Sequence, residues 1–375
     1  MQATTPISAD GAPSGRLTID LGAVRENWRR LDARAGGAET GAVVKADAYG
    51  LGLARIAPAL WQAGARRFYV ARTEEGAAAR PLLPEADIVT MAPVLPEELA
   101  TARAARLVVT LNAPEDLACW RADAVARGHA LPAMLHLDTG MTRLGFDDAR
   151  FLEVWDGLSE AERAAVVEVS SHLACADDPD HPANRSQLER FRKAVRPLPR
   201  DLRRSLANSS GMFLGGDFLQ TSTRPGMALY GLNPTPGRPN PMRDVVTLDV
   251  RVLQTRRLAR TETVGYGAAA AAPAGARIAT IAAGYADGLH RSMASAGAVY
   301  IQTYRAPILG RVSMDLIAID VTDIPEHLVR PGVYVQAIGP RQSADDLARA
   351  ADTIGYEILT GLGRRHARIY LDGDS

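Results

Sequence analysis

The sequence predicts an α/β protein with two domains, an N-terminal (β/α)8 barrel of the TIM type and a C-terminal, mainly β domain. Three observations lead to this prediction. Short apolar runs alternate with alanine-rich helical segments, a proline-rich stretch then ends that pattern, and period-two alternation follows it. At 375 residues the chain is long enough for both domains. The expected boundaries are a disordered tail over 1–15, the barrel over 16–235 and the β domain over 242–375.

The barrel prediction rests on eight strand-like runs. A short strand at 16–21 and an amphipathic helix at 22–34 come first, and helical segments such as 114–127 separate most of the later runs. The eight runs are 42–46, 68–71, 87–91, 107–111, 133–138, 166–172, 204–209 and 221–224. An open doubly wound sheet is the alternative, but no G-x-G-x-x-G turn follows the first run, which disfavours a dinucleotide-binding fold.

The β domain is predicted from a change of pattern after a linker. Residues 233–241 hold four prolines and a glycine, as linkers between domains often do. Residues 246–252 then alternate as a half-buried antiparallel strand should. Further strands are expected at 276–283, 298–302, 308–320, 333–338 and 367–371, with one helix at 344–354.

Composition narrows the class of protein. Lys plus Arg and Asp plus Glu number 43 each, so no charge excess points to nucleic acid or to an acidic membrane. No apolar run is long enough to cross a bilayer, and the first fifteen residues lack the features of a secretory signal. The two cysteines, Cys119 and Cys175, make no disulfide framework. We therefore expect a cytoplasmic protein, with no bound metal.

Reactive side chains collect at the predicted strand ends, where barrel enzymes place their active sites. Lys45 ends an apolar run, and an amine in that position suits covalent attachment of a carbonyl compound, although a solvated lysine at a strand end would look the same. The other strand ends carry Tyr49, Arg143, His172, Ser209, Arg224 and Gly226 with Met227. A serine hydroxyl and the N–H groups near a glycine can bind phosphate. Lysine and phosphate site together suggest pyridoxal phosphate.

Five motifs in the same order resemble those of the alanine racemase family, and the resemblance runs from Arg16 to Leu371. They occupy 43–50 (VVKADAYG), 138–145, 223–231, 284–288 and 310–315. The resemblance implies a homodimeric enzyme that uses pyridoxal phosphate to interconvert L- and D-alanine, for peptidoglycan or in alanine catabolism. A broad-specificity amino-acid racemase that accepts serine or larger side chains is the alternative.

The same resemblance implies roles for individual residues. Lys45 would carry the cofactor and act as one base, and Tyr266 of the partner subunit would be the other, because the α-proton leaves one face and returns on the opposite one. Arg224 would donate to the pyridine nitrogen. The implied cofactor-binding residues are Lys45, Tyr49, His172, Ser209, Arg224, Gly226, Met227 and Tyr356. The implied substrate-binding residues are Arg143, Met314, Asp315 and Tyr285.

The chain departs from the family pattern at two places near the site. His136 stands where members often carry a carbamylated lysine, and we expect it to be a hydrogen-bonded core residue. Arg143 would then be positioned by Asp138 or by a bound anion, or it would be held less firmly than in other family members. The alanine run 268–272 replaces the family's usual threonine and tyrosine, which predicts a wider or more apolar entrance.

Two rival functions fit the sequence less well. A decarboxylase of the same architecture would typically pair a glutamate with the pyridine nitrogen and place a cysteine at the interface, where this chain has Arg224 and Ser313. A non-catalytic carrier of pyridoxal phosphate on a lone barrel would need neither the second domain nor Tyr266.

Overall fold

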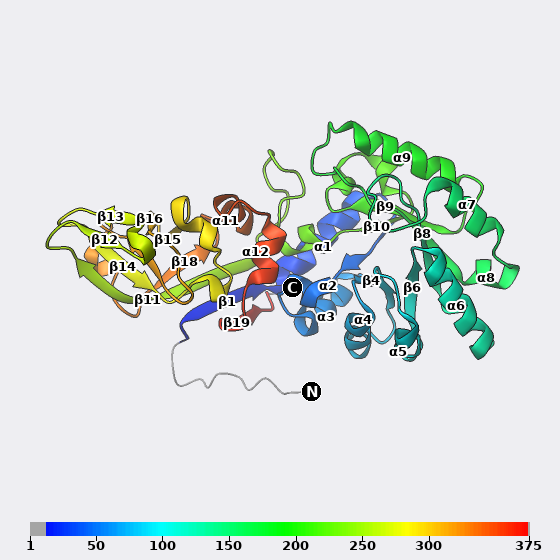
Figure 1. Ribbon diagram of the computed structural model, residues 1–375, viewed down its shortest axis with the longest axis horizontal. Coiled ribbons are helices and arrows are strands. Elements are labelled where there is room, and N and C mark those ends of the chain that lie inside the picture. Colours follow the sequence, from blue (N-terminus) through cyan, green and yellow to red (C-terminus); the bar gives the residue numbers. More distant parts are fainter. Residues whose placement is uncertain (1–12, 374–375) are drawn as a thin grey trace. The chain divides into compact units, whose positions relative to one another are not determined.

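The computed structural model describes residues 13–373, which form two compact units (Figure 1). One unit comprises residues 23–243. The other combines the described residues up to Gly22 with those from Asp244 onward. No helix among residues 13–373 is long and apolar enough to span a bilayer.

The first unit is a barrel built on one nine-stranded sheet, ordered β2-β10-β9-β8-β7-β6-β5-β4-β3, in which every pairing is parallel. β2 and β3 are consecutive segments on either side of Gly41. β2 pairs with β10 and β3 with β4, and Val43 N also donates to Pro225 O at 2.9 Å. These bonds close the sheet on itself, so the barrel prediction is confirmed and the open sheet is excluded. The strands are β2 Glu39–Thr40, β3 Ala42–Val43, β4 Arg67–Val70, β5 Asp87–Thr90, β6 Leu107–Leu111, β7 Ala133–His136, β8 Val166–Ser170, β9 Arg203–Asn208 and β10 Ser222–Arg224.

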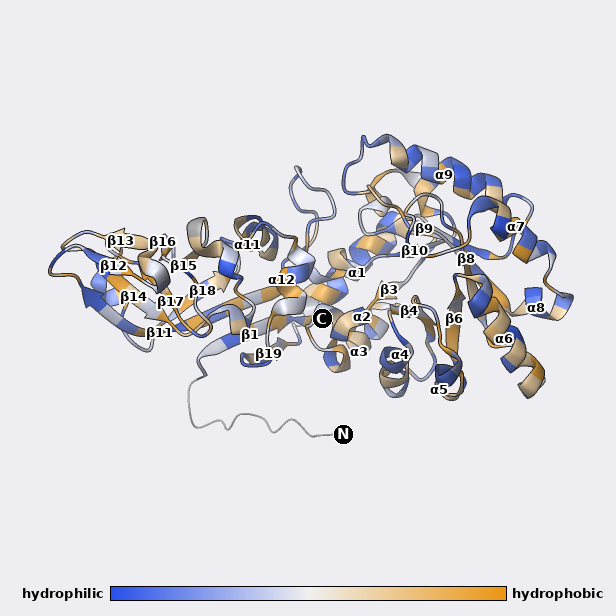
Figure 2. Ribbon diagram, in the orientation of Figure 1, coloured by the Kyte–Doolittle hydropathy of each residue, from blue (hydrophilic) through white to orange (hydrophobic). Residues whose placement is uncertain are grey.

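Gly41 lies between β2, which pairs with β10, and β3, which pairs with β4. A Cβ at this position would lie 2.6 Å from Tyr69 Cε2 and 3.1 Å from Thr223 O. Only glycine leaves room for such close strands. Strand β6 is buried at every position, and Figure 2 shows its apolar character. Burial on both faces is expected of a parallel barrel strand.

Helices lie between most of the barrel strands, as predicted. α6 has the predicted bounds, because Pro114 suits the first turn and Gly128, with a φ of 77°, ends the helix. The α-helices are α1 Leu21–Ala35, α2 Lys45–Tyr49, α3 Leu53–Ala63, α4 Thr73–Ala79, α5 Leu99–Ala104, α6 Pro114–Arg127, α7 Asp148–Asp156, α8 Glu160–Ala165, α9 Pro182–Val195 and α10 Gly216–Leu219. Short 3₁₀ turns are η1 Arg80–Leu82, η2 Pro96–Glu98, η3 Gly211–Phe213 and η4 Met227–Tyr230.

The second unit is mainly β, as predicted, and its main sheet has eight strands in the order β14-β17-β16-β15-β18-β11-β1-β19. Its long strand β11 buries alternate residues. The strands are β1 Gly15–Asp20, β11 Val246–Arg257, β14 Arg277–Ile281, β15 Ala298–Ile301, β16 Tyr304–Leu309, β17 Ile317–Asp320, β18 Tyr334–Ile338 and β19 Ala367–Leu371, and a separate hairpin joins β12 Glu262–Val264 to β13 Ala270–Ala272. The helices are α11 Ala344–Ala350, α12 Gly355–Gly361 and the 3₁₀ turns η5 Tyr266–Ala268, η6 Tyr285–Asp287, η7 Arg291–Ser295 and η8 Glu326–Leu328.

The start of the chain differs from our expectation. β1 pairs antiparallel with β11 and parallel with β19, so residues 16–22, which we had assigned to the barrel, belong to the second unit. Leu17 and Ile19 are fully buried there. Their alternation marked a strand but could not indicate which sheet receives it.

The structure also differs from the disordered tail that we predicted over residues 1–15. Residues 1–12 lie outside the described part of the chain. Ser14 O accepts a hydrogen bond from Arg251 N at 2.9 Å, and Gly15 begins β1. The end of the predicted tail is therefore part of the sheet.

Two other expected elements are divided in the structure. The strand expected at 308–320 is two strands, β16 and β17, and the helix expected at 344–354 ends at Ala350 before α12.

Candidate active site

Lys45 lies two residues beyond the end of β3 and begins α2. Val44 N donates to Tyr69 O at 2.8 Å, and beyond Lys45 the chain turns sharply. Residues 46–49 all have a φ between 53° and 56°. A left-handed conformation costs about 1–2 kcal/mol for each residue with a Cβ. Four in a row persist only where the surroundings hold them, and such strain is commonly found at functional sites.

The environment of Lys45 favours a neutral amine. Burial and the nearby guanidinium of Arg143 lower the pKa of Lys45, and the carboxylate of Glu75 opposes them in part. A lysine attacks a carbonyl group through its unprotonated form. This lysine is therefore suited to form a covalent bond with a carbonyl compound.

A small cradle lies beside the lysine turn. Ser209 follows β9, and its Oγ accepts hydrogen bonds from Gly226 N at 2.9 Å and from Ala228 N at 3.3 Å. A Cβ at Gly226 would lie 2.3 Å from the Tyr49 hydroxyl. Tyr49 in turn packs on Tyr230, with ring centres 4.6 Å apart. Hydroxyl groups and main-chain N–H groups are the donors that bind phosphate in proteins, and here the two N–H groups are bonded to Ser209 Oγ.

Arg224, at the end of β10, is buried and firmly held. Its Nη1 donates to Ser205 Oγ and its Nη2 to the Ser171 carbonyl oxygen. Among residues 13–373, none accepts a hydrogen bond from its Nε. A guanidinium stays charged and only donates, so Arg224 fits a ring nitrogen that carries no proton.

Two histidines face the same cluster of positive charge, and both are neutral at neutral pH. Burial, followed by the charges of Arg224, Arg143, His136 and Lys45, lowers the pKa of His172 to about 3. Burial and Arg224 lower the pKa of His136 to about 4. These couplings show that side chains from the ends of four strands lie near one another at the barrel mouth, as the sequence predicted.

His136 is hydrogen-bonded, as predicted. Its Nδ1 lies 2.7 Å from Asn112 Oδ1 at the end of the neighbouring strand. Sequence reasoning missed Asn112, because a single polar residue after an apolar run carries no specific signal.

Asp138 binds the main chain of the loop that carries Arg143. It does not bind the Arg143 guanidinium. Asp138 Oδ1 accepts hydrogen bonds from Gly140 N and Met141 N at 2.9 Å and from Thr142 N at 3.1 Å. Arg143 is exposed, and its side chain forms no hydrogen bond or ion pair with another residue of the described chain. Asp138 therefore fixes the loop that carries Arg143, whereas no residue of the described chain fixes the guanidinium.

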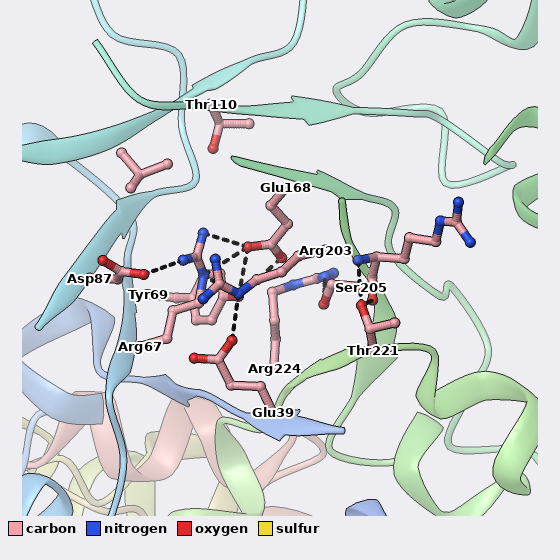
Figure 3. Close-up of polar contacts among 12 residues, drawn as sticks. Glu39, Arg67, Tyr69, Asp87, Thr110, Glu168, Arg203, Ser205, Thr221 and Arg224 are labelled. Carbon is pink, nitrogen blue, oxygen red and sulfur yellow. Dashed lines mark hydrogen bonds and ion pairs between the residues drawn. The ribbon is translucent and has the colours of Figure 1, made fainter. Parts of the chain in front are cut away.

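A buried polar network crosses the barrel interior, with Arg224 at one side (Figure 3). Arg67 Nε donates to Glu168 Oε2 at 2.8 Å, and Arg67 Nη1 lies 2.6 Å from Asp87 Oδ2. The Tyr69 hydroxyl lies 3.1 Å from both Glu168 oxygens, and burial raises its pKa. The Arg224 guanidinium is 6.0 Å from the centre of the Tyr69 ring.

Sequence reasoning missed this network. Its one signal was a charged residue, Glu168, inside the otherwise apolar run Val166–Val169.

The remaining predicted residues belong to the second unit, where the structure brings two motifs together. Tyr285 N donates to Ser313 O and Ala286 N to Met314 O, both at 3.0 Å. A Cβ at Gly284 would lie 2.3 Å from both carbonyl oxygens, so this contact requires glycine. Met314 and Tyr285 are exposed together at this junction, with 52% and 44% of their surfaces accessible.

Tyr266 begins η5 in the hairpin between β12 and β13, and 71% of its surface is exposed. It lines a hollow of about 400 Å³ with Arg311 and Ser313. Asp315 Oδ1 accepts a hydrogen bond from Arg365 Nη1 at 2.8 Å. Tyr356 lies in α12, a helix that the sequence analysis did not predict.

Comparisons with known proteins agree across nearly the whole chain. The family model for the N-terminal domain of alanine racemase matches residues 19–234, and the model for the C-terminal domain matches residues 245–370. The alanine racemase of Rhizobium meliloti is 46% identical over 373 residues, which cover 96% of this chain and 97% of that protein. A catabolic alanine racemase of Agrobacterium fabrum is 45% identical over 365 residues, covering 97% and 94%.

A solved structure shows the same fold. The crystal structure of alanine racemase from Bartonella henselae with covalently bound pyridoxal phosphate has a TM-score of 0.90 at 36% identity, and the match covers 96% of this chain and 100% of that one. The chain has a barrel with a lysine at its mouth and a second, mainly β unit, and its relatives are alanine racemases. Together these findings define a two-domain amino-acid isomerase. The chain belongs to the alanine racemase family.

Proposed function

We propose that this chain interconverts L- and D-alanine with pyridoxal phosphate attached to Lys45. The observation that carries the proposal is a lysine of lowered pKa beside a cradle that fits phosphate. When bound, the cofactor withdraws electrons from the α-carbon of the substrate and so makes its proton removable. The pyridoxal phosphate bound covalently in the Bartonella henselae structure supports the assignment of this cofactor.

The chain's own residues bind and orient the cofactor. Lys45 would hold the cofactor covalently through its amine, and Arg224, which only donates, would hold the ring nitrogen in its unprotonated form. His172, neutral because of its low pKa, contributes a hydrogen bond rather than a charge. The phosphate is held by Tyr49, Ser209, the main chain at Gly226 and Met227, and Tyr356.

Racemisation requires one base on each face of the substrate, and we assign these roles to Lys45 and Tyr266. A tyrosine has a pKa of about 10 in water, so Tyr266 needs a neighbouring cation or hydrogen-bond donor to act near neutral pH. Arg224 provides the fixed positive charge at the mouth. Arg143, Met314, Asp315 and Tyr285 complete the substrate site.

Tyr266 comes to the site from the second subunit of a homodimer in this proposal. On the second unit, 71% of the surface of Tyr266 and 52% of that of Met314 are exposed. Exposed apolar side chains within functional motifs are typical of surfaces that a partner covers.

A panel of L-amino acids in deuterated buffer tests the activity. Alanine should lose its optical activity and gain deuterium at the α-carbon of both enantiomers, which requires proton removal. Serine, lysine and arginine test the alternative of a broad-specificity racemase, which the small side chains of Ala270–Ala272 favour. Equal or faster turnover of lysine would overturn the narrow assignment.

Mixed dimers test the shared site. Lys45→Ala and Tyr266→Phe chains should each be inactive alone, whereas exchange of their subunits should restore one wild-type site in each mixed dimer. Each variant taken through the same exchange by itself is the control. No recovery, in dimers shown by native mass spectrometry to be mixed, would refute sharing.

A further inference from the structure

The Glu75 carboxylate connects the lysine turn to the neighbouring strand. Glu75 lies in α4, and its Oε1 accepts a hydrogen bond from Ala46 N at 2.7 Å. Its Oε2 accepts hydrogen bonds from Ala71 N at 2.7 Å and Arg72 N at 3.3 Å. One side chain thus binds the residue after Lys45 and the end of β4 together.

These contacts begin where the main-chain bonds between β3 and β4 end. Val44 N still donates to Tyr69 O. Two residues farther on, the Ala71 carbonyl accepts from Ala92 N at 2.9 Å, on the side of β5. Ala46 N instead donates to Glu75, so a side chain continues the pairing that the backbone no longer makes.

The turn that Glu75 binds is under backbone strain. Ala46 is the first of the four left-handed residues. The far end is held by Asp47, whose Oδ1 accepts from Leu53 N at 2.7 Å. Glu75 holds the near end, next to Lys45. Removing it would leave Ala46 N without its acceptor and the turn free to relax toward a right-handed conformation.

Glu75 also acts on the amine through its charge. Burial and Arg143 lower the pKa of Lys45, and Glu75 raises it. Because Glu75 is half-buried, solvent screens its field only in part.

We propose that Glu75 is a positioning residue for Lys45, which holds the left-handed turn so that the amine enters the barrel mouth in a single orientation. The inference deepens the proposed function, because it concerns the residue that carries the cofactor there. Glu75 acts through the backbone of Ala46, whose N–H it accepts.

Hydrogen exchange and amine labelling of the full chain test the proposal directly. In Glu75→Ala, the amides of Ala46 and Ala71 should exchange at least tenfold faster. Competitive labelling of Lys45 in protein freed of pyridoxal phosphate should show a lower pKa. Glu75→Gln keeps an acceptor for one amide only, so its exchange should fall between that of Glu75→Ala and that of the wild type. Its Lys45 pKa should be lowered as in Glu75→Ala, because both variants lose the carboxylate charge. Unchanged exchange at Ala46 and an unchanged pKa of Lys45 in both variants would overturn the proposal.

Glu74→Gln is the matched control, since Glu74 is the adjacent residue of α4 and only forms an exposed ion pair with Arg72 at 3.6 Å. It should behave as the wild type in both measurements. Protection of Val108 and Val109 in β6 shows whether each variant remains folded. If Glu75→Ala loses that protection, Glu75→Gln carries the test.

Kinetics separate this proposal from the proposed function. If the wild type racemises alanine, Glu75→Ala should lower kcat at least tenfold and change KM less than threefold. A change confined to KM would contradict positioning of the amine. If the wild type does not racemise alanine, the proposed function fails, while exchange and labelling still decide the role of Glu75.

Discussion

Gly226→Ala should weaken cofactor binding by obstructing the phosphate cradle. The new Cβ would lie 2.3 Å from the Tyr49 hydroxyl and 3.3 Å from Val43 Cβ. Favourable contacts between such atoms lie near 3.5 Å. Gly226 has a φ of −126° and a ψ of −82°, which lies outside the regions that residues with a Cβ favour. Backbone strain therefore adds to the steric cost, and the Tyr49 hydroxyl must move.

The size of the effect follows from how tightly Tyr49 is packed. Its side chain is only 6% exposed and lies against Tyr230. Overpacking of this kind costs about 1–3 kcal/mol of stability. In the proposed site, a displaced hydroxyl would also lose its hydrogen bond to the phosphate, worth about 1.5–3 kcal/mol for a charged acceptor. That loss corresponds to roughly tenfold to 150-fold weaker binding.

Titration with pyridoxal phosphate, followed by visible absorbance, measures the affinity, and urea unfolding measures the stability. Tyr49→Phe supplies the control background, because the nearest atom to the new Cβ is then Cζ at 3.2 Å. Gly226→Ala should cost clearly less stability in that background, so the two changes should be non-additive. An equal loss in both backgrounds would refute the steric reasoning.

Two further predictions concern the barrel interior. The pKa of His136 is about 4 in the folded protein and 6.5 in the unfolded one, so the unfolded chain binds the proton more readily. The contribution of His136 to the free energy of unfolding should be full above about pH 6.5 and should fall toward pH 4, by up to about 3 kcal/mol. Urea unfolding of His136→Gln should show a shallower decline of stability with falling pH. An equal decline in the variant and the wild type would contradict this. Glu168→Ala removes the fully buried partner of Arg67, which keeps only the half-exposed Asp87 carboxylate, and should cost about 3 kcal/mol. Glu153→Ala, in an exposed pair with Arg150, should cost at most about 1 kcal/mol. Similar losses of unfolding free energy in the two variants, measured by urea unfolding, would contradict a larger contribution from the buried pair.

The sequence predicted the elements whose signals are local. Helix α6 has the expected bounds because a proline begins it and a glycine ends it. Strand β6 was evident from its continuous apolar run. The barrel and the β domain followed from the order of such elements.

For the site, the sequence identified Lys45 and the strand ends around it by residue type and order. It could not identify Glu75 or Asn112. Each acts through one hydrogen bond or a few of them to residues distant in sequence, and a lone glutamate or asparagine in a polar segment looks like surface.

The sequence by itself determined which residues form strands and helices, which lysine follows the first barrel strand, and the family to which those motifs point. Only the tertiary structure decided which strands and side chains pair with one another. β1 joined the C-terminal sheet because alternation specifies a buried face and not the neighbouring strand. Arg67 and Glu168 became a buried ion pair across the barrel. The four residues after Lys45 became left-handed because contacts from Glu75 and Asp47 hold them, against the intrinsic preference of their own backbone.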